Sequence, residues 1–231
     1  MIRSERTDRV RRGALAAASA AALMLTACGG GGADGAGEEP EPGVVAGEVC
    51  HGLFAGDEGK ALRTTLGTET FAQSPDDESA GEAARKLAAE STDDGAWREQ
   101  RICSVHKGPQ AGIADLTVTA ERVQPAVADA THSGPGVARY VVGRGAWADA
   151  NKAVVYVDCL SPKLAGADGT SPAVLAVSAW NRTFPQGDAA KYQEPNLVLA
   201  HAGAVALAKE LSCKDNGGLA DRLTAQPAPA G

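Results

Sequence analysis

The stretch DLTVTAERV, residues 115–123, has the pattern of a β-strand. It is rich in the Val and Thr that fit a pleated strand, and its character alternates with a period of two residues. One side of such a strand is apolar: Leu116, Val118 and Ala120. The other side carries two threonines, Thr117 and Thr119. The stretch therefore predicts a strand with two different sides.

Further stretches of the same kind follow or precede it. They are RICSV at 101–105, ARYVV at 138–142, AVVYVDCL at 153–160 and AVLAVSAW at 173–180. The last three are short and rich in Val or Ala, which is typical of strands, and RICSV around Cys103 is a candidate fifth strand. We predict surface loops at 109–112 and 124–135.

Helical patterns lie at both ends of this strand-rich part. In 53–67, Gly67 occupies the position of a left-handed C-terminal cap. Ser79 and Glu82 form a capping box before a second helix over 83–90. The longest pattern, 195–213, begins with Pro195 in its first turn, and Asp215-Asn-Gly-Gly218 ends it.

The order of these elements favours an α+β fold. The connections between strands are too short for crossover helices, so we expect a mainly antiparallel sheet packed by N- and C-terminal helices. Residues 44–219 are enough for one domain with its own core. We expect residues 220–231, which end in QPAPAG, to be a flexible tail.

The N-terminus has the order of an export signal. Five arginines lie within the first twelve residues, and an almost wholly apolar run, 14–27, follows them. That run is shorter than the roughly 20 residues that a membrane-spanning helix needs. We therefore predict a signal peptide over residues 1–27.

The tetrad Leu25-Thr-Ala-Cys28 resembles the lipobox of bacterial lipoproteins, in which the cysteine becomes the first residue of the mature chain and is lipidated. The resemblance implies a lipid on Cys28 and a location on the extracytoplasmic face of the cell membrane. The Gly-, Pro- and acid-rich residues 28–43 then form a flexible tether. Arg11-Arg12 suggests twin-arginine export, but Gly13-Ala14 favours the general secretory route.

The charge of the chain limits its partners. The formal net charge is −7, and removing residues 1–27, with five Arg, one Glu and one Asp, makes it −10. Such a surface repels nucleic-acid phosphates and anionic lipid headgroups. We expect no nucleic-acid partner, and we expect the lipid on Cys28 to be the contact with the membrane.

Four cysteines remain in the mature domain: Cys50, Cys103, Cys159 and Cys213. An even number outside the cytoplasm indicates two disulfides, and three pairings are open. We favour Cys50 with Cys103 and Cys159 with Cys213, since each pair closes one half of the chain. The cysteines are too dispersed for a structural metal site.

Several stretches resemble the small cell-envelope lipoproteins of high-GC actinomycetes such as streptomycetes. They are VCHGLF at 49–54, KAL at 60–62 through Leu66-Gly67, CLSP at 159–162 and the 197–213 helix that ends in KELSC. The resemblance spans most of residues 48–219. It implies an exported, lipid-anchored surface protein and no established activity, so it assigns no catalytic residue.

Three sequence patterns suggest chemistry, and each has a structural alternative. GRGAWA at 143–148 has the spacing of a dinucleotide-binding turn, but too few residues follow for the helix it requires, so a glycine-rich connection is favoured. Cys50-His51 and Cys103-x-x-His106 place thiols near imidazoles, but disulfides are the simpler interpretation. His132-Ser133 lacks the elbow of a serine hydrolase. His201 is expected on the apolar side of the last helix.

The aromatic residues offer one candidate ligand contact. Of the three tryptophans, Trp97, Trp147 and Trp180, the last is followed by Asn181-Arg182 near a strand end. An aromatic plane beside an amide and a guanidinium suits a sugar or a peptide of the cell wall, although packing of the tryptophan in the core is the alternative.

These patterns favour a non-enzymatic binding or accessory protein of the cell envelope, whose partner is an envelope protein or a wall component. They assign no cofactor, no metal ligand and no catalytic residue. The alternatives are an envelope hydrolase with a dispersed site, and a small-ligand-binding lipoprotein that feeds a transporter. The second alternative usually needs two lobes, for which this domain is small.

Overall fold

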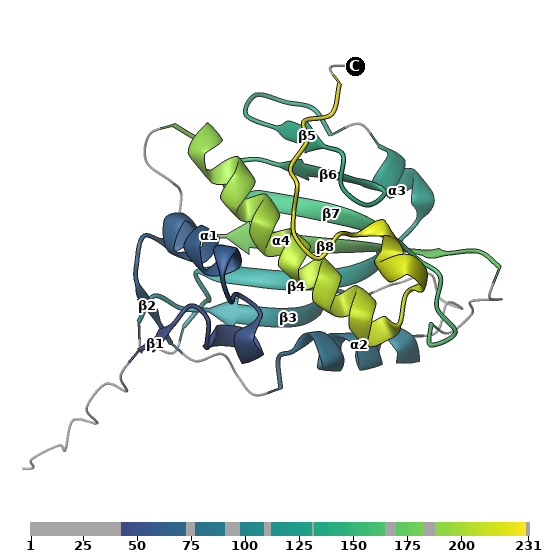
Figure 1. Cartoon of the computed structure of the whole chain (residues 1–231), viewed down its shortest axis with the longest axis horizontal. Coiled ribbons are helices and arrows are strands. Elements are labelled where there is room, and N and C mark those ends of the chain that lie inside the picture. Colours follow the sequence, from purple (N-terminus) through teal and green to yellow (C-terminus); the bar gives the residue numbers. More distant parts are fainter. Residues whose placement is uncertain are drawn as a thin grey trace, which may run out of the picture. The chain divides into compact units, whose positions relative to one another are not determined.

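A six-stranded antiparallel sheet forms the centre of the computed structural model (Figure 1). The structure describes residues 43–72, 77–90, 98–108, 112–130, 132–164, 170–182 and 188–229. All of them belong to one unit, 40–231. The signal peptide, Cys28, the tether up to residue 42 and Trp97 lie outside the described residues.

The strands run in the spatial order β3-β4-β8-β7-β6-β5. Their bounds are β3 Gln100–Val105, β4 Leu116–Val123, β5 Ala138–Tyr140, β6 Gly145–Ala148, β7 Lys152–Cys159 and β8 Ala173–Asn181. A separate two-stranded sheet pairs β1 (Val44–Val45) with β2 (Thr70–Phe71). The described elements thus confirm the predicted α+β class with a mainly antiparallel sheet.

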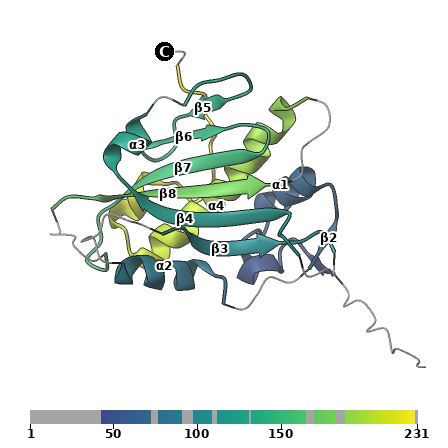
Figure 2. The ribbon, with the colours of Figure 1, turned by 180° about the vertical axis from the view of Figure 1, so that it is seen from behind.

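Helices cover one side of the large sheet. They are α1 (Asp57–Leu66), α2 (Ala80–Ala89) and α4 (Ala190–Leu211), and α4 crosses the strands diagonally (Figure 1). Two short 3₁₀ helices complete this layer. The first, η1 (Val49–Gly52), lies next to β3, and the second, η2 (Lys214–Gly218), lies next to β7. Seen from behind, the strands lie in front of these helices (Figure 2). We call the side that packs against α4 the covered face and the opposite side the outer face.

The period of two in the strands explains these two faces. On the covered face, alternate residues of β4, β7 and β8 are buried in one core: Leu116, Val118, Ala120, Ala153, Val155, Val157, Leu175, Val177 and Ala179. The residues between them, such as Thr117 and Ser178, belong to the outer face. Burying these side chains is the main favourable contribution to folding.

The middle of α4 lies very close to the sheet at Gly203. A Cβ atom at this position would lie 2.6 Å from Cγ1 of Val118 and 3.2 Å from Cγ1 of Val177. Any larger residue would force the helix and the strands apart, because protein cores are packed without spare volume. Gly203 therefore fixes the distance between the helix layer and the sheet.

The helix ends agree with the sequence in two places and differ in a third. Gly67 caps α1 in the left-handed conformation, and the Ser79 side chain accepts a hydrogen bond from the Glu82 amide at the start of α2. The prediction that Pro195 lies in the first turn of the last helix is wrong, since α4 begins at Ala190. The Asp188 carboxylate accepts a hydrogen bond from the Ala190 amide and helps to start the helix there.

Both favoured disulfides are present. Cys50 in η1 bonds to Cys103 in β3, with 5.6 Å between their Cα atoms. Cys159 at the end of β7 bonds to Cys213 just after α4, with 4.8 Å between their Cα atoms. Each bridge ties a helical segment of the covered face to a strand of the large sheet.

The C-terminal segment contacts the sheet, where the sequence predicted a flexible tail from residue 220. Leu219 is buried, and Leu223 and Ala225 pack against the core. Farther on, the amide of Val141 donates to the Gln226 carbonyl at 2.9 Å, and the amide of Ala228 donates to the carbonyl of Arg139 at 2.8 Å. The segment thus runs beside β5 at the edge of the sheet, and residues up to 229 belong with the domain.

Two elements near the candidate site have no counterpart in the prediction. Part of the expected loop 124–135 forms a short helix, α3 (Pro125–Asp129), with Pro125 at its first position. The last four residues of GRGAWA form β6. Both lie near the α3 end of the outer face, where the candidate site is found.

Candidate functional site

A hollow of about 370 Å³ opens on the outer face near β5, β6 and β7. It is bordered by the end of α3, by the loop that carries His132, and by the connection from β5 to β6. Ala228 of the C-terminal segment also lines it. Four side chains dominate its chemistry, and they come from three separate parts of the chain: Asp129, Arg144, Trp147 and Tyr156.

The turn before β6 places Arg144 beside the hollow. Gly143 has a φ of 55°, and a Cβ atom there would lie 2.6 Å from the carbonyl oxygen of Tyr156. The amide of Arg144 donates to that same oxygen at 2.9 Å. Only glycine combines this left-handed conformation with such a close approach of two backbones. The GxGxxA spacing is therefore a tight turn followed by a strand, as the favoured alternative predicted.

Gly145 leaves the floor of the hollow open. It pairs with Tyr156 across β6 and β7, and it lines the hollow. A Cβ atom at Gly145 would meet no atom within 4 Å. A side chain added here would therefore occupy free space in the hollow.

A cluster of three rings forms one wall. The imidazole of His132 stacks on the Trp147 indole, with centroids 4.9 Å apart and an angle of 24° between the planes. It also lies 6.0 Å from the Tyr156 ring, at an angle of 20°. The Tyr156 hydroxyl and His132 Nε2 are hydrogen-bonded at 3.0 Å. This bond holds the loop after α3 against the sheet.

Tyr156 is a neutral phenol in this environment. Burial raises the pKa of Tyr156, and the negative charge of Glu121 raises it further. The nearby indole N–H of Trp147 lowers the pKa in part, although that N–H does not reach hydrogen-bond geometry. A raised pKa keeps the hydroxyl protonated at neutral pH, so it binds as a hydrogen-bonding group and does not act as an anion.

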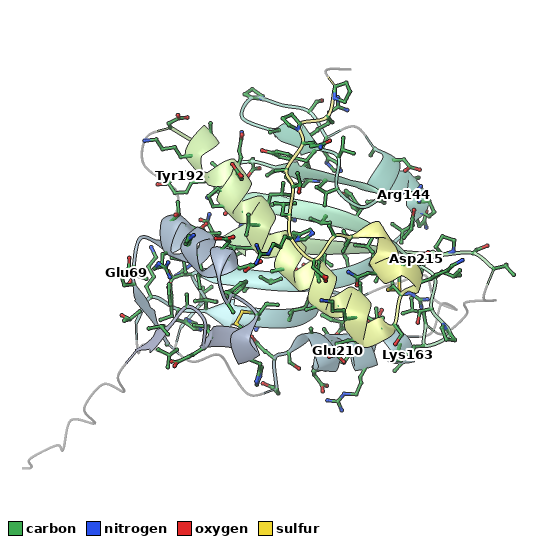
Figure 3. All side chains as sticks on the ribbon, in the orientation of Figure 1. Glu69, Arg144, Lys163, Tyr192, Glu210 and Asp215 are labelled. Carbon is green, nitrogen blue, oxygen red and sulfur yellow. A yellow bond between two sulfur atoms is a disulfide. The ribbon has the colours of Figure 1, made fainter. Side chains whose placement is uncertain are left out.

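Arg144 is held on two sides by carboxylates. Its Nε and Nη2 donate to the two carboxylate oxygens of Asp129 at 2.9 and 2.8 Å, and its Nη1 donates to Asp158 Oδ1 at 2.8 Å. These hydrogen bonds, first to Asp158 and then to Asp129, raise the pKa of Arg144. Figure 3 shows Arg144 near α3 and away from the labelled residues of α4. The paired geometry fixes the guanidinium plane.

The hollow offers several binding groups. Among the residues that the structure describes, none that lines it is Ser, Thr or Cys. Among the described residues, no group of three or more His, Cys, Asp or Glu could hold a metal ion. The ionised side chains Arg144, Asp129 and Asp158 neutralise one another in part, and His132 is bound to Tyr156. This arrangement presents rings and oriented hydrogen-bonding groups to a ligand.

The candidate contact predicted at Trp180, Asn181 and Arg182 does not form one surface. Trp180 is 42% exposed, whereas Asn181 is 1% exposed and donates to Asn196 Oδ1 at 3.2 Å below α4. Arg182 donates to the Ile113 carbonyl at 3.3 Å. Consecutive residues of a strand point to opposite faces, so Trp180 and Asn181 are separated by the sheet. Trp180 remains an exposed ring at the far end of β8.

The other sequence candidates take structural positions. Cys50 and Cys103 are joined in a disulfide, so neither is a free thiol next to His51 or His106. His201 is buried on α4, as expected, and has a backbone hydrogen bond with Ala220. His132 lies in a loop, as predicted, but its contacts with two strands were not foreseen.

Sequence reasoning missed Arg144, Asp129, Asp158 and Tyr156. No local motif joins them, because they meet only after β6 and β7 have paired and α3 has folded over the sheet. One signal was available: Asp158 and Arg144 are charged residues within or beside apolar strand stretches, where an ion pair is the usual compensation.

Comparison with known proteins finds no matching family model, no matching curated protein and no matching solved structure. In the part of the chain that the structure describes, no helix has the length and apolar character required to cross a membrane.

Proposed function

We propose that this chain is a lipid-anchored, extracytoplasmic protein of the cell envelope that binds another envelope component without changing it chemically. The lipobox-like LTAC at 25–28 supports the anchor, and the resemblance to actinomycete lipoproteins supports the location. Two disulfides fit a protein that folds outside the cytoplasm.

One observation carries the binding function. Arg144, Asp129 and Asp158 are bonded to one another and the imidazole of His132 is bonded to a phenol, while no described Ser, Thr or Cys lines the space. A catalytic site keeps a nucleophile or base free to react. A binding site gains from groups that are already oriented, because less freedom is lost when the ligand arrives.

The anchor is tested with the full chain expressed in a bacterium that processes lipoproteins. We expect the wild-type protein to enter the detergent-rich phase and to have a mass that includes acyl groups on Cys28. Cys28→Ala should shift the protein to the aqueous phase. If Cys28→Ala stays in the detergent-rich phase at an unchanged mass, the lipid anchor is disproved.

The binding function is tested by incubating the purified protein with isolated cell wall. We expect the protein to sediment with the wall and to release no soluble fragment detectable by mass spectrometry. A Trp147→Ala variant should sediment less, whereas Trp180→Phe should sediment as the wild type does. Fragment release that disappears in Tyr156→Phe would contradict the proposal.

That contrary result would favour the second candidate, an envelope hydrolase. The hydrogen bond between Tyr156 and His132 is the observation behind it, since such a pair could transfer a proton. A bell-shaped dependence of fragment release on pH, altered by His132→Gln, would identify this activity.

A further inference from the structure

We propose that the hollow on the outer face binds one ring of an uncharged glycan. This inference rests on the proposed binding function and specifies its ligand class. It follows from the volume of the hollow, the balance of its charges, its hydrogen-bonding groups and its aromatic wall.

The volume suits one ring. The hollow measures about 370 Å³, near the lower end of the roughly 300–1,000 Å³ found for ligand pockets. The open floor at Gly145 allows the ligand to lie close to the backbone of β6. A short oligosaccharide would place one ring in the hollow and extend the others into solvent.

The charges favour an uncharged ligand. Arg144 is paired with both Asp129 and Asp158, and together with Arg139 the two positive and two negative charges beside the hollow sum to zero. Arg139 also lines the hollow, and its Nη2 donates to the carbonyl of Pro229 at 3.1 Å. An anionic ligand would have to compete with two carboxylates for Arg144. A cationic ligand would meet the guanidinium of Arg144.

The hydrogen-bonding groups suit hydroxyls. A guanidinium has five N–H donors, and Arg144 uses three of them on Asp129 and Asp158. The Asp129 carboxylate, which lines the hollow, retains acceptor positions, and its side chain is partly exposed. A hydroxyl group both donates and accepts, so a polyhydroxylated ring can bond to the Asp129 carboxylate and to the Arg144 guanidinium at once.

The aromatic wall supplies the apolar contact. Trp147, Tyr156 and His132 all line the hollow, and their mutual contacts fix the positions of the rings. A sugar ring has C–H groups that pack on aromatic side chains, while its hydroxyls bond at the edges. Aromatic residues with a polar atom are suited to such partly wet sites.

The test is a titration of the purified protein, labelled with ¹⁵N, with chitotriose, with maltotriose and with tri-galacturonate as the charged counterpart. We expect one of the two uncharged trisaccharides to shift the indole signal of Trp147 and to bind at least tenfold more tightly than tri-galacturonate. Gly145→Val should weaken this binding at least tenfold, because its side chain occupies the hollow. Gly145→Ala serves as a second, smaller variant if Gly145→Val does not fold.

Trp180→Phe is the matched control, because Trp180 is an exposed ring on the same face at a distance from the hollow along β8. It should bind the trisaccharide as the wild type does. Shifts confined to Trp180, or tighter binding of tri-galacturonate, would overturn the inference. Absence of binding to both uncharged trisaccharides would overturn it as well. Continued sedimentation with the cell wall in that case would leave the proposed binding function standing.

Discussion

The two faces of the sheet differ most clearly at two glycines. At Gly203, which faces the sheet from α4, an added Cβ atom would collide with Val118 at 2.6 Å. At Gly145 on the outer face, the same atom would meet nothing within 4 Å. The same residue type thus serves close packing on one face and leaves open space on the other.

This difference separates stability from recognition. The covered face buries apolar side chains, both disulfides and the buried amides below α4. The outer face holds the ion pairs of Arg144, the ring cluster and the hollow. We therefore expect substitutions on the covered face to lower the free energy of unfolding, and substitutions at the hollow to change binding at nearly constant stability.

The largest effect is expected from removing a disulfide of the covered face. The Cys159→Ala/Cys213→Ala double variant opens a loop with a sequence separation of 54. In the chain-entropy model this lowers the free energy of unfolding by about 4 kcal/mol, with a usual range of roughly 2–4 kcal/mol. Urea denaturation followed by circular dichroism measures the loss. A loss below 1 kcal/mol would show that this bridge contributes little to the covered face.

The next largest effect is expected at Gly203, and Gly145 is the position to compare with it. Gly203→Leu should lower the free energy of unfolding by about 2–3 kcal/mol, because it overpacks the contact between α4 and the sheet. Gly145→Val should change it by less than about 0.5 kcal/mol. Equal losses at the two positions would remove the distinction between the faces. Thermal unfolding of both variants under the same conditions measures the two losses.

A smaller effect is expected at a buried amide below α4. The Asn196 side chain donates to the carbonyls of Asp149 and Ala150, both at 3.1 Å, and accepts from Asn181. Asn196→Ala removes these bonds, although the Asn181 amide still donates to the Ala150 carbonyl at 3.3 Å, and should cost about 1–3 kcal/mol because the Asp149 carbonyl loses its partner. On the outer face, Asp129→Asn should cost at most about 1 kcal/mol, because its partner Arg144 keeps Asp158 and both are partly exposed. Chemical denaturation of both variants tests this order.

The smallest effect concerns pH and the covered face. Burial lowers the pKa of His201, while Glu58 and the hydrogen bond with Ala220 raise it in part. The unfolded chain therefore binds the proton of His201 more readily than the folded chain does. As the pH falls below about 6.5, the ordinary pKa of histidine, the free energy of unfolding decreases, and above that pH His201 causes no decrease. Urea midpoints at pH 7.5, 6.5 and 5.5 should fall more for the wild type than for His201→Gln. Parallel profiles would contradict the prediction.

Local sequence patterns predicted the parts of the fold that depend on near neighbours. The alternation in 115–123, the cap at Gly67 and the cap at Ser79 act within a few residues, and the structure confirms all three. Of the predicted capping box, the structure shows the Ser79 half, while the Glu82 carboxylate pairs with Arg85 and Lys86. The start of α4 was misplaced because Pro195 is common in first turns, although Asp188 provides an earlier start. The path of the C-terminal segment depends on the edge of β5 and on the core, which no local pattern encodes.

The candidate site was less predictable for the same reason. Trp180, Asn181 and Arg182 are neighbours in sequence, but the pleat of β8 separates the first two. Trp147, His132 and Arg144 lie in different segments and become neighbours through pairing of β6 with β7 and folding of α3. The ion pairs and the ring cluster are long-range contacts, so they follow from the topology of the sheet.

The α+β class, the sides of the strands, the helix caps and the even set of cysteines could be read from residues 43–219 alone, because they depend on periodicity, on local hydrogen bonds and on composition. Three features could be known only from the folded chain: which tryptophan borders a hollow, which cation lies between two carboxylates, and where the C-terminal segment runs. Those outcomes require contacts between residues far apart in the chain, and such contacts are fixed by how the sheet, α3 and α4 pack together.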